Sequence, residues 1–193
     1  IHDNLLDLSH LGYVHLKRIG GDAHLHMNAE MKVTQEGDSV KVVRLMPGSN
    51  PPPTYRAAWP FGDKCDRWQE IVFRVSHLEI WTGAIEPGTD SSENPDRGGF
   101  HMRGFHGITP ETETTCHYFW SMASNRHPER EDNFETVVKQ TAFTFDEDRG
   151  VIEAQYQNMR QFGAQATWMD IHVDAGANRA RRIVERLKAQ AVA

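Results

Sequence analysis

The chain opens with a hydrophobic pattern of helical period. Leu5, Leu8 and Leu11 recur at a spacing that places them on one face of a helix. An Asp-Asn pair precedes this pattern and a Gly-Gly pair follows it, which is where helices prefer to begin and end. The pattern therefore predicts a helix over residues 3–17.

Further along, the hydrophobic period becomes that of strands. Residues 24–34 and 40–46 flank a polar, glycine-containing turn and predict a β-hairpin. β-Branched and aromatic residues predict more strands, separated by turns, which favours an antiparallel sheet. These strands are expected at residues 70–75, 77–85, 99–108 and 114–122. Loops are expected at the proline-rich residues 47–53, running on towards residues 57–68, and at the polar residues 86–99.

The last third of the chain returns to helical period. Residues 133–159 carry apolar positions at helical spacing, and residues 177–190 predict a second helix with a basic face. Residues 124–132 between sheet and helix read as a loop. The order of elements indicates one α+β domain over residues 1–193, with helices on one face of a curved sheet.

Composition and charge exclude several classes of protein. A net charge of −6 and the absence of a Lys/Arg-rich run argue against nucleic acid or an anionic membrane as a partner. Cys65 and Cys116 stand in no C-x-x-C pattern and are expected to be reduced thiols. No apolar stretch of about 18 residues and no signal-peptide pattern is present, so we expect a cytoplasmic protein.

The N-terminal segment DNLLDLSHLGYVH carries the strongest chemical signal. His10 and His15 lie five residues apart, and two histidines with one carboxylate are typical of non-haem Fe(II) oxygenases. Positions five apart lie about 140° around a regular helix, so sharing a metal requires a distortion, for which Gly12 offers a place. Asp7 shares a helical face with His10 and can accept a hydrogen bond from its second ring nitrogen. The alternative is an ordinary amphipathic helix with half-exposed histidines.

Other histidines offer rival sites. His24 and His26 alternate on a predicted strand, where they are either metal ligands or half-buried strand residues. His106 ends a strand before a turn, where its side chain either points into a pocket or forms a hydrogen bond in the core. Zincin, nucleophile-elbow, P-loop and dinucleotide-binding motifs are absent, which removes the usual support for hydrolase and nucleotide-cofactor functions.

A third metal ligand has to come from far along the chain. The segment DEDRGVIEA offers Asp146, Glu147 and Asp148 beside the predicted helix. Spacing alone does not choose among the three, because acidic clusters usually form a solvated helix face.

These residues together resemble a known family. DNLLDLSHLGYVH resembles the N-x-x-D-x-x-H-x-x-x-x-H iron motif of the catalytic domain of Rieske non-haem iron oxygenases, in particular the vanillate and dicamba O-demethylase group. GFHGITPETETTCHYFW resembles the strand and turn before the C-terminal helices of that group, and FDEDRGVIEAQ resembles the segment that supplies its third ligand. The three motifs span almost the whole chain.

The resemblance implies a role for individual residues. By this match the metal ligands are His10, His15 and Asp148. Asp7 takes the position of the bridging aspartate, which links an iron ligand to the Rieske centre of a neighbouring subunit. The remaining two matches place Asn4 close to the iron and His106 against the aromatic substrate.

The chain also departs from the family pattern. A Rieske [2Fe-2S] cluster needs two cysteines and two histidines in C-x-H and C-x-x-H pairs, and no such pairs occur here. We therefore expect the N-terminal Rieske domain to lie outside this chain, which would be the mononuclear iron domain.

The resemblance further implies a fold and an activity. The fold is a helix-grip, a curved antiparallel sheet around a long helix. The activity is O₂-dependent hydroxylation or O-demethylation of a small aromatic compound at a mononuclear Fe(II). Electrons would come from NAD(P)H through a reductase or ferredoxin component and the Rieske cluster, in a homotrimer. An O-demethylated ether would yield formaldehyde and a phenol.

Two other classes of protein fit the residues. A metal-free helix-grip domain would bind a small hydrophobic molecule in the same cavity. A metal-dependent hydrolase would hold zinc, which also accepts two histidines and a carboxylate. The metal content separates all three hypotheses.

Overall fold

The computed structural model describes residues 1–130, 133–163 and 169–192. The helical elements are α1 (His2–Leu6), the 3₁₀ helix η1 (Leu8–His10), α2 (Leu11–Val14), α3 (Ala23–Met27), α4 (Pro53–Ala58), α5 (Phe134–Phe162), the 3₁₀ helix η4 (His172–Asp174) and α6 (Ala175–Val192). The strands are β1 (Glu30–Glu36), β2 (Ser39–Ser49), β3 (Cys65–Arg74), β4 (His77–Ile85), β5 (Phe100–Pro110) and β6 (Cys116–Ser124).

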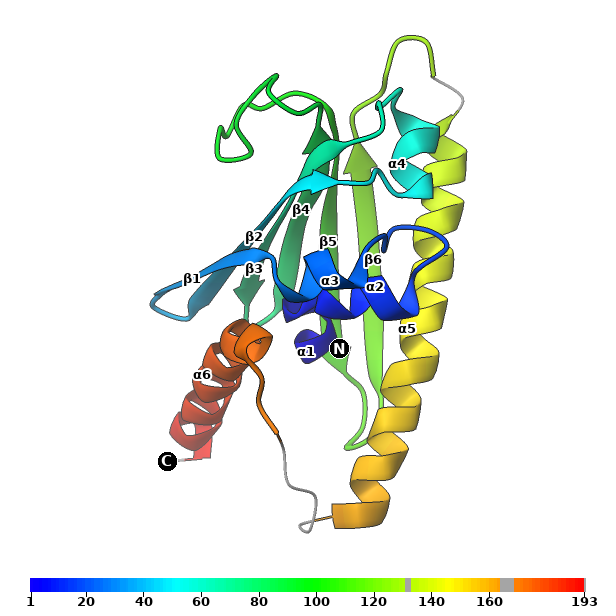
Figure 1. Ribbon diagram of the computed structural model, residues 1–193. Coiled ribbons are helices and arrows are strands. Elements are labelled where there is room, and N and C mark those ends of the chain that lie inside the picture. Colours follow the sequence, from blue (N-terminus) through cyan, green and yellow to red (C-terminus); the bar gives the residue numbers. More distant parts are fainter. Residues whose placement is uncertain (131–132, 164–168, 193) are drawn as a thin grey trace.

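The strands form one antiparallel sheet in which each strand pairs with its neighbours in sequence, in the order β1 to β6 (Figure 1). Short turns join most of the strands, which is the connection that antiparallel pairs allow. The register places His106 of β5 between Leu78 of β4 and Trp120 of β6. Because side chains alternate between the two faces of a sheet, all three point to the same face. The predicted antiparallel sheet is confirmed.

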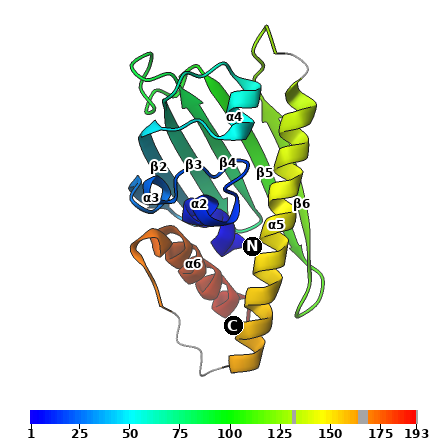
Figure 2. The ribbon, with the colours of Figure 1, turned by 45° about the vertical axis from the view of Figure 1, so that its right-hand side comes forward.

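The helices gather on one face of the sheet, as the sequence predicted (Figure 2). The long helix α5 runs beside β5 and β6, and the short N-terminal helices lie between α5 and α6. Helix α6 contacts β2 and α1. Its Gly176 permits a close approach, since a Cβ atom there would lie 2.5 Å from Val42 Cγ2. This α+β arrangement is the helix-grip fold that the resemblance implied.

The covered face of the sheet carries two hydrophobic clusters. One joins β2, β3 and β4 to α1 and α6, and includes Leu6, Val42, Phe73, Leu78 and Ile183. The other lies nearer α4 and the start of α5, and includes Tyr55, Phe61, Cys65, Phe100 and Val137. Burying such side chains stabilises the fold by about 1.5 to 3 kcal/mol each. The N-terminal segment packs into the first cluster and is thereby fixed against the sheet.

The predicted helix over residues 3–17 is wrong as a continuous element. The chain instead forms three short pieces, with Asp7 in an extended conformation (φ −118°, ψ 100°) between α1 and η1. The Asp7 carboxylate accepts a hydrogen bond from the backbone N–H of Ser9 and so starts the next turn. Gly12, expected to be the point of distortion, lies inside α2, where a Cβ atom would come within 2.4 Å of the Ala23 backbone.

Two other predictions fail locally. Residues 24–28 were expected in a strand, but Asp22 caps a short helix there, so only residues 30–36 form the first arm of the hairpin. Residues 47–53 are not one loop, because β2 continues to Ser49 past an irregularity after Met46, and α4 begins at Pro53. Proline is favoured in the first turn of a helix, where its missing N–H costs nothing.

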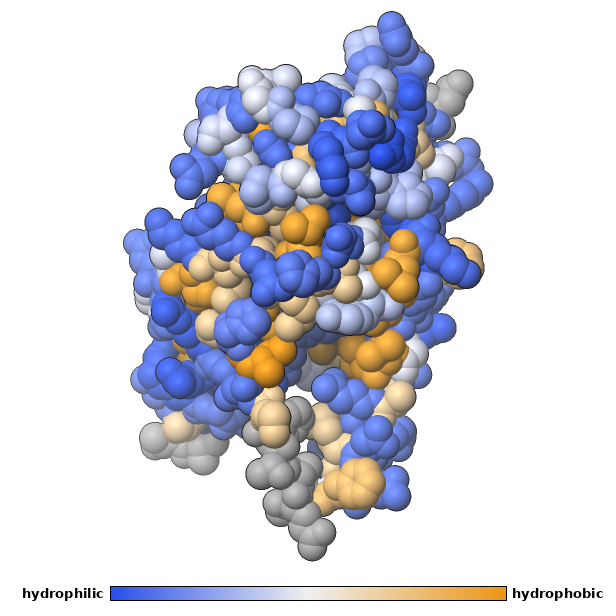
Figure 3. Space-filling view, viewed as in Figure 1, coloured by the Kyte–Doolittle hydropathy of each residue, from blue (hydrophilic) through white to orange (hydrophobic). Residues whose placement is uncertain are grey.

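The helices at the end of the chain agree with the sequence pattern. Helix α5 extends a few residues beyond the predicted range 133–159, and α6 contains the predicted range 177–190. Part of the expected loop 124–132 lies outside the described residues. Within the described chain, no helix combines the length and apolar character needed to cross a membrane. Apolar side chains do reach the surface over the N-terminal helices and beside α5 (Figure 3).

Candidate metal centre

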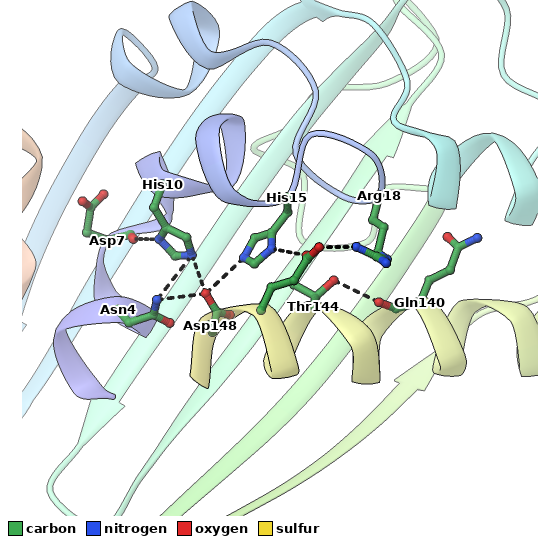
Figure 4. A network of polar contacts seen from close by, with 9 residues as sticks. Asn4, Asp7, His10, His15, Arg18, Gln140, Thr144 and Asp148 are labelled. Atoms are coloured by element: carbon green, nitrogen blue, oxygen red, sulfur yellow. Dashed lines mark hydrogen bonds and ion pairs between the residues drawn. The ribbon is translucent and has the colours of Figure 1, made fainter. Parts of the chain in front are cut away.

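Three side chains converge between the N-terminal helices and α5. His10 ends η1, His15 follows α2, and Asp148 projects from the middle of α5 towards both of them (Figure 4). Their ligand atoms all lie within 4.8 Å of one another. Among the described residues, no other group of three or more histidine, cysteine, aspartate and glutamate side chains has this geometry.

The shortest distances in the group join the carboxylate to the imidazoles. Asp148 Oδ1 lies 3.1 Å from His15 Nε2 and 3.3 Å from His10 Nε2. Two ligand atoms at right angles, each about 2.1 Å from one metal ion, would lie about 3.0 Å apart. The observed separations therefore fit adjacent positions around a single transition-metal ion.

The second nitrogen of each imidazole is held by a group that only accepts hydrogen bonds. His10 Nδ1 lies 2.7 Å from the backbone oxygen of Asp7, and His15 Nδ1 lies 2.8 Å from Glu147 Oε2. Both Nδ1 atoms must therefore carry the proton, which leaves each Nε2 lone pair directed at Asp148. Three electron-pair donors then face one another, and a positive centre between them, a metal ion or protons, is required to hold them together.

The local charges act in the same direction. Where protons rather than a metal ion lie between these atoms, burial opposes ionisation of Asp148, but hydrogen bonds from His10 and His15 outweigh burial and hold the pKa of Asp148 well below its usual range. Burial also lowers the pKa of His15, yet its hydrogen bonds to Asp148 and Glu147 raise the pKa overall. Asp148 is thus ionised at neutral pH, as a metal ligand must be.

Asn4 and Asp7 both lie beside the three converging residues. Asn4 Nδ2 donates to Asp148 Oδ1 at 3.1 Å and thereby orients the carboxylate. Asp7 contacts His10 through its backbone oxygen, as Figure 4 shows, while its carboxylate binds Ser9. The expected contact to His10 exists, but it does not use the side chain of Asp7.

The three acidic residues of α5, which spacing left unresolved and from which the resemblance selected Asp148, have separate surroundings. Asp148 is buried against the histidines, whereas Asp146 is exposed and pairs with Arg149 at 3.6 Å. Glu147 binds the far side of the His15 ring and forms an ion pair with Arg18. The sequence offered Glu147 only as a possible ligand. Its actual contact depends on which way α5 faces the N-terminal segment, and no local pattern indicates this.

His106 lies in the wall of a cavity that also reaches the three converging residues. It is almost fully buried, and its Nδ1 lies 2.7 Å from the hydroxyl oxygen of Tyr118. Burial lowers the pKa of His106 to about 4, so the ring is neutral at physiological pH. Gly104 leaves room beside it, because a Cβ atom there would lie 2.7 Å from His106 Nε2.

The cavity is lined mainly by apolar side chains. Leu8 and Leu11 of the N-terminal segment face Ile80 and Met102 of the sheet across it, and Phe145 of α5 borders it. An apolar cavity with a few polar groups is the usual form of a small-molecule site. The sequence predicted His106 but none of the polar residues of the sheet that also line the cavity.

The rival pair of histidines does not form a site. His24 and His26 lie on α3, where His24 is exposed and His26 is buried with Nε2 donating to the Gly20 oxygen at 2.7 Å. Burial and the nearby Arg67 lower the pKa of His26 to about 3. His26 is a hydrogen-bonded core residue, and the strand expected here is absent.

Comparisons with known proteins agree with this arrangement. The chain is 32% identical to a vanillate O-demethylase oxygenase subunit of Pseudomonas sp. strain HR199, covering 97% of this chain and 54% of the relative. It is also 32% identical to a toluene-4-sulfonate monooxygenase system iron-sulfur subunit of Comamonas testosteroni, with 97% and 54% covered. The chain thus spans about half the length of these curated relatives.

Solved structures give the same result. A crystal structure of dicamba monooxygenase bound to 3,6-dichlorosalicylic acid superposes with a TM-score of 0.83 at 26% identity, covering 100% of this chain and 56% of that one. The family model for the vanillate O-demethylase oxygenase C-terminal domain matches residues 1–190. The chain therefore belongs to the vanillate O-demethylase oxygenase C-terminal domain family.

Proposed function

We propose that this chain is the mononuclear iron domain of a Rieske-type oxygenase, with His10, His15 and Asp148 as the ligands of Fe(II). The observation that best supports this proposal is that the three side chains converge on one point. The Nδ1 atom of each imidazole is hydrogen-bonded to an acceptor, so each Nε2 is free to bind the metal. Two histidines and one carboxylate on one side of a metal leave positions for O₂ and substrate, which suits Fe(II) oxygenase chemistry.

The reaction we propose is O₂-dependent hydroxylation or O-demethylation of a small aromatic compound. Family membership supports it, since relatives are named for vanillate O-demethylation and toluene-4-sulfonate monooxygenation. Bound Fe(II) would supply O₂ activation. Hydroxylation of an ether methyl group gives a hemiacetal, which breaks into formaldehyde and a phenol.

The chain's own residues would bind and orient the substrate. The apolar cavity wall excludes water and accepts a flat ring. His106, neutral and almost buried, would provide a hydrogen bond to the substrate, since Tyr118 occupies only one of its two ring nitrogens. Asn4 would keep the Asp148 carboxylate in its ligand orientation through the 3.1 Å hydrogen bond.

Electrons would reach the centre from outside this chain. We infer a Rieske [2Fe-2S] cluster in an N-terminal domain, a reductase or ferredoxin component, and NAD(P)H as the source. Asp7 would bridge His10 to the cluster of a neighbouring subunit in a homotrimer. Its partial exposure and the exposed apolar side chains of Tyr13 and Leu16 on the same segment support a contact there.

Metal analysis and turnover of the intact protein test the proposal. We expect about one mononuclear iron per chain beyond the cluster iron, and formaldehyde release from a methoxybenzoate with O₂, NAD(P)H and a reductase. Stoichiometric zinc with hydrolysis and no O₂ uptake would favour the metal-dependent hydrolase. Ligand binding without any bound metal would favour the metal-free binding domain.

A further inference from the structure

Two arginines are buried on the covered face of the sheet without a carboxylate partner. Arg44 of β2 and Arg67 of β3 are 1% and 2% exposed. Arg67 donates to the backbone oxygens of Gly20 at 2.7 Å and Ile19 at 3.0 Å. Arg44 donates to Gln69 Oε1 at 3.1 Å and to a backbone oxygen of α3. Within the described chain, neither guanidinium forms an ion pair.

Such an arrangement leaves positive charge uncompensated inside the protein. Burying a charge among neutral acceptors is costly, and a second like charge nearby adds repulsion. Burial lowers the pKa of Arg44, and Arg67 lowers it further against the opposing influence of Asp7. The depressed pKa of the neighbouring His26 has the same two arginines among its causes. An anion bound here would remove this penalty.

The positive region lies in the wall of the substrate cavity. Arg67 and Gln69 line the same cavity as the three converging residues and His106. Each also keeps a buried N–H group, at Arg67 Nε and Gln69 Nε2, that has no hydrogen-bond partner among the described residues. A guanidinium has five N–H groups, so the two backbone contacts leave Arg67 with donors to spare.

We propose that Arg67 and Gln69 form an anion subsite that binds the carboxylate or sulfonate of an aromatic substrate, while its ring lies against the apolar wall. The aromatic ring of the ligand follows from the proposed function. The subsite adds which charged group on that ring the cavity binds. A competing interpretation is that Arg67 only fixes residues 19 and 20 behind His15. The two interpretations differ in whether the charge of the ligand matters.

Binding measurements on the intact protein separate these interpretations. The probes are 4-methoxybenzoate and its neutral amide, which have nearly the same shape, with affinities measured by calorimetry. We expect the wild type to bind the acid at least tenfold more tightly, because the carboxylate, unlike the amide, carries the countercharge that the buried guanidinium lacks. Equal affinities, or no binding of the acid, would overturn the subsite.

Gln69→Glu provides the decisive variant. Glutamate can still accept from Arg44, but it places a negative charge where the ligand anion would bind. We expect the preference to reverse in favour of the amide, while the melting temperature of the ligand-free protein stays equal or rises because the two arginines gain a countercharge. Gln69→Met, which removes both the amide donor and the oxygen that accepts from Arg44, should weaken acid binding without reversing the preference.

A matched control makes the same chemical change outside the cavity. Gln35 is exposed on β1, and within the described part of the chain its amide binds only the backbone oxygen of Gly37, at 3.2 Å. Gln35→Glu should leave the ratio of acid to amide affinity unchanged. An unchanged ratio in Gln69→Glu as well would overturn the proposal. Because binding is measured without turnover, a protein that prefers the acid but holds no iron would contradict the proposed function and leave the subsite standing.

Discussion

Residues 2–15 bring two imidazoles and their hydrogen-bonding partners together in three short helical pieces, whereas α5 contributes one carboxylate from a regular helix of 29 residues. The N-terminal pieces are too short to be stable alone and are held by their buried leucines. In α5, only Val137, Thr144 and Asp148 are buried, and Val151 is 50% exposed.

The difference shows how the two regions hold the three proposed metal ligands. His10 and His15 depend on packing, because their positions follow from an irregular backbone that the core fixes. Asp148 depends on the orientation of a helix that presents one acidic side chain inwards and its neighbour Asp146 outwards. Substitutions in the two regions should therefore change different properties of the protein.

The largest effect should come from the carboxylate of α5. Asp148→Ala in the intact protein should lower iron affinity by more than roughly 100-fold. Loss of a residue that only hydrogen-bonds to a ligand typically lowers the affinity by about 10- to 100-fold, and this substitution removes a proposed ligand itself. Metal analysis after dialysis measures it, with circular dichroism to confirm folding. Asp146→Ala is the matched control on the same helix and should keep its iron. Equal iron in both variants would contradict the assignment of Asp148.

A smaller effect of another kind is expected in the N-terminal segment. Asp7→Asn should keep most of the iron, because the backbone oxygen of Asp7 holds His10 and asparagine can still accept from Ser9. NAD(P)H-driven turnover should fall by roughly tenfold or more if the carboxylate bridges to the cluster of a neighbouring subunit. Full coupled activity would rule out the bridging role, and a stable monomer in sedimentation would count against the homotrimer.

The smallest effect should arise where the two regions meet. Glu147→Ala removes the acceptor at His15 Nδ1 and should weaken iron binding by about tenfold, since such partners fix the ring and increase its basicity. Arg18→Gln should act in the same direction but less, because Arg18 contacts Glu147 and not the ring. Optical spectra of the cobalt-substituted protein would reveal a changed His15 environment. Identical spectra and affinity in Glu147→Ala would show that Glu147 is not a positioning residue.

Some elements were predictable because their signals are local. The strands alternate over enough residues to define their period, and α5 is long enough for a helical pattern to stand out. The short stretch HLHM was wrongly predicted as a strand, because alternation over four residues does not distinguish a strand from a helix. The side chain of the preceding Asp22 accepts hydrogen bonds from the first backbone N–H groups and so starts a helix here. Helix α4 was not predicted, because the prolines before it were interpreted only as residues that interrupt regular structure, although proline is also favoured in the first turn of a helix.

The sequence by itself determined the antiparallel sheet, the long helix and the pair of histidines with their neighbouring aspartate. Each of these features depends on residues that are only a few positions apart in the chain. The tertiary structure decided which acidic residue of α5 faces the histidines, that Glu147 lies behind His15, and that Arg67 and Gln69 reach the same cavity. These contacts join residues far apart in the chain, and they depend on how helices and strands pack rather than on any local pattern.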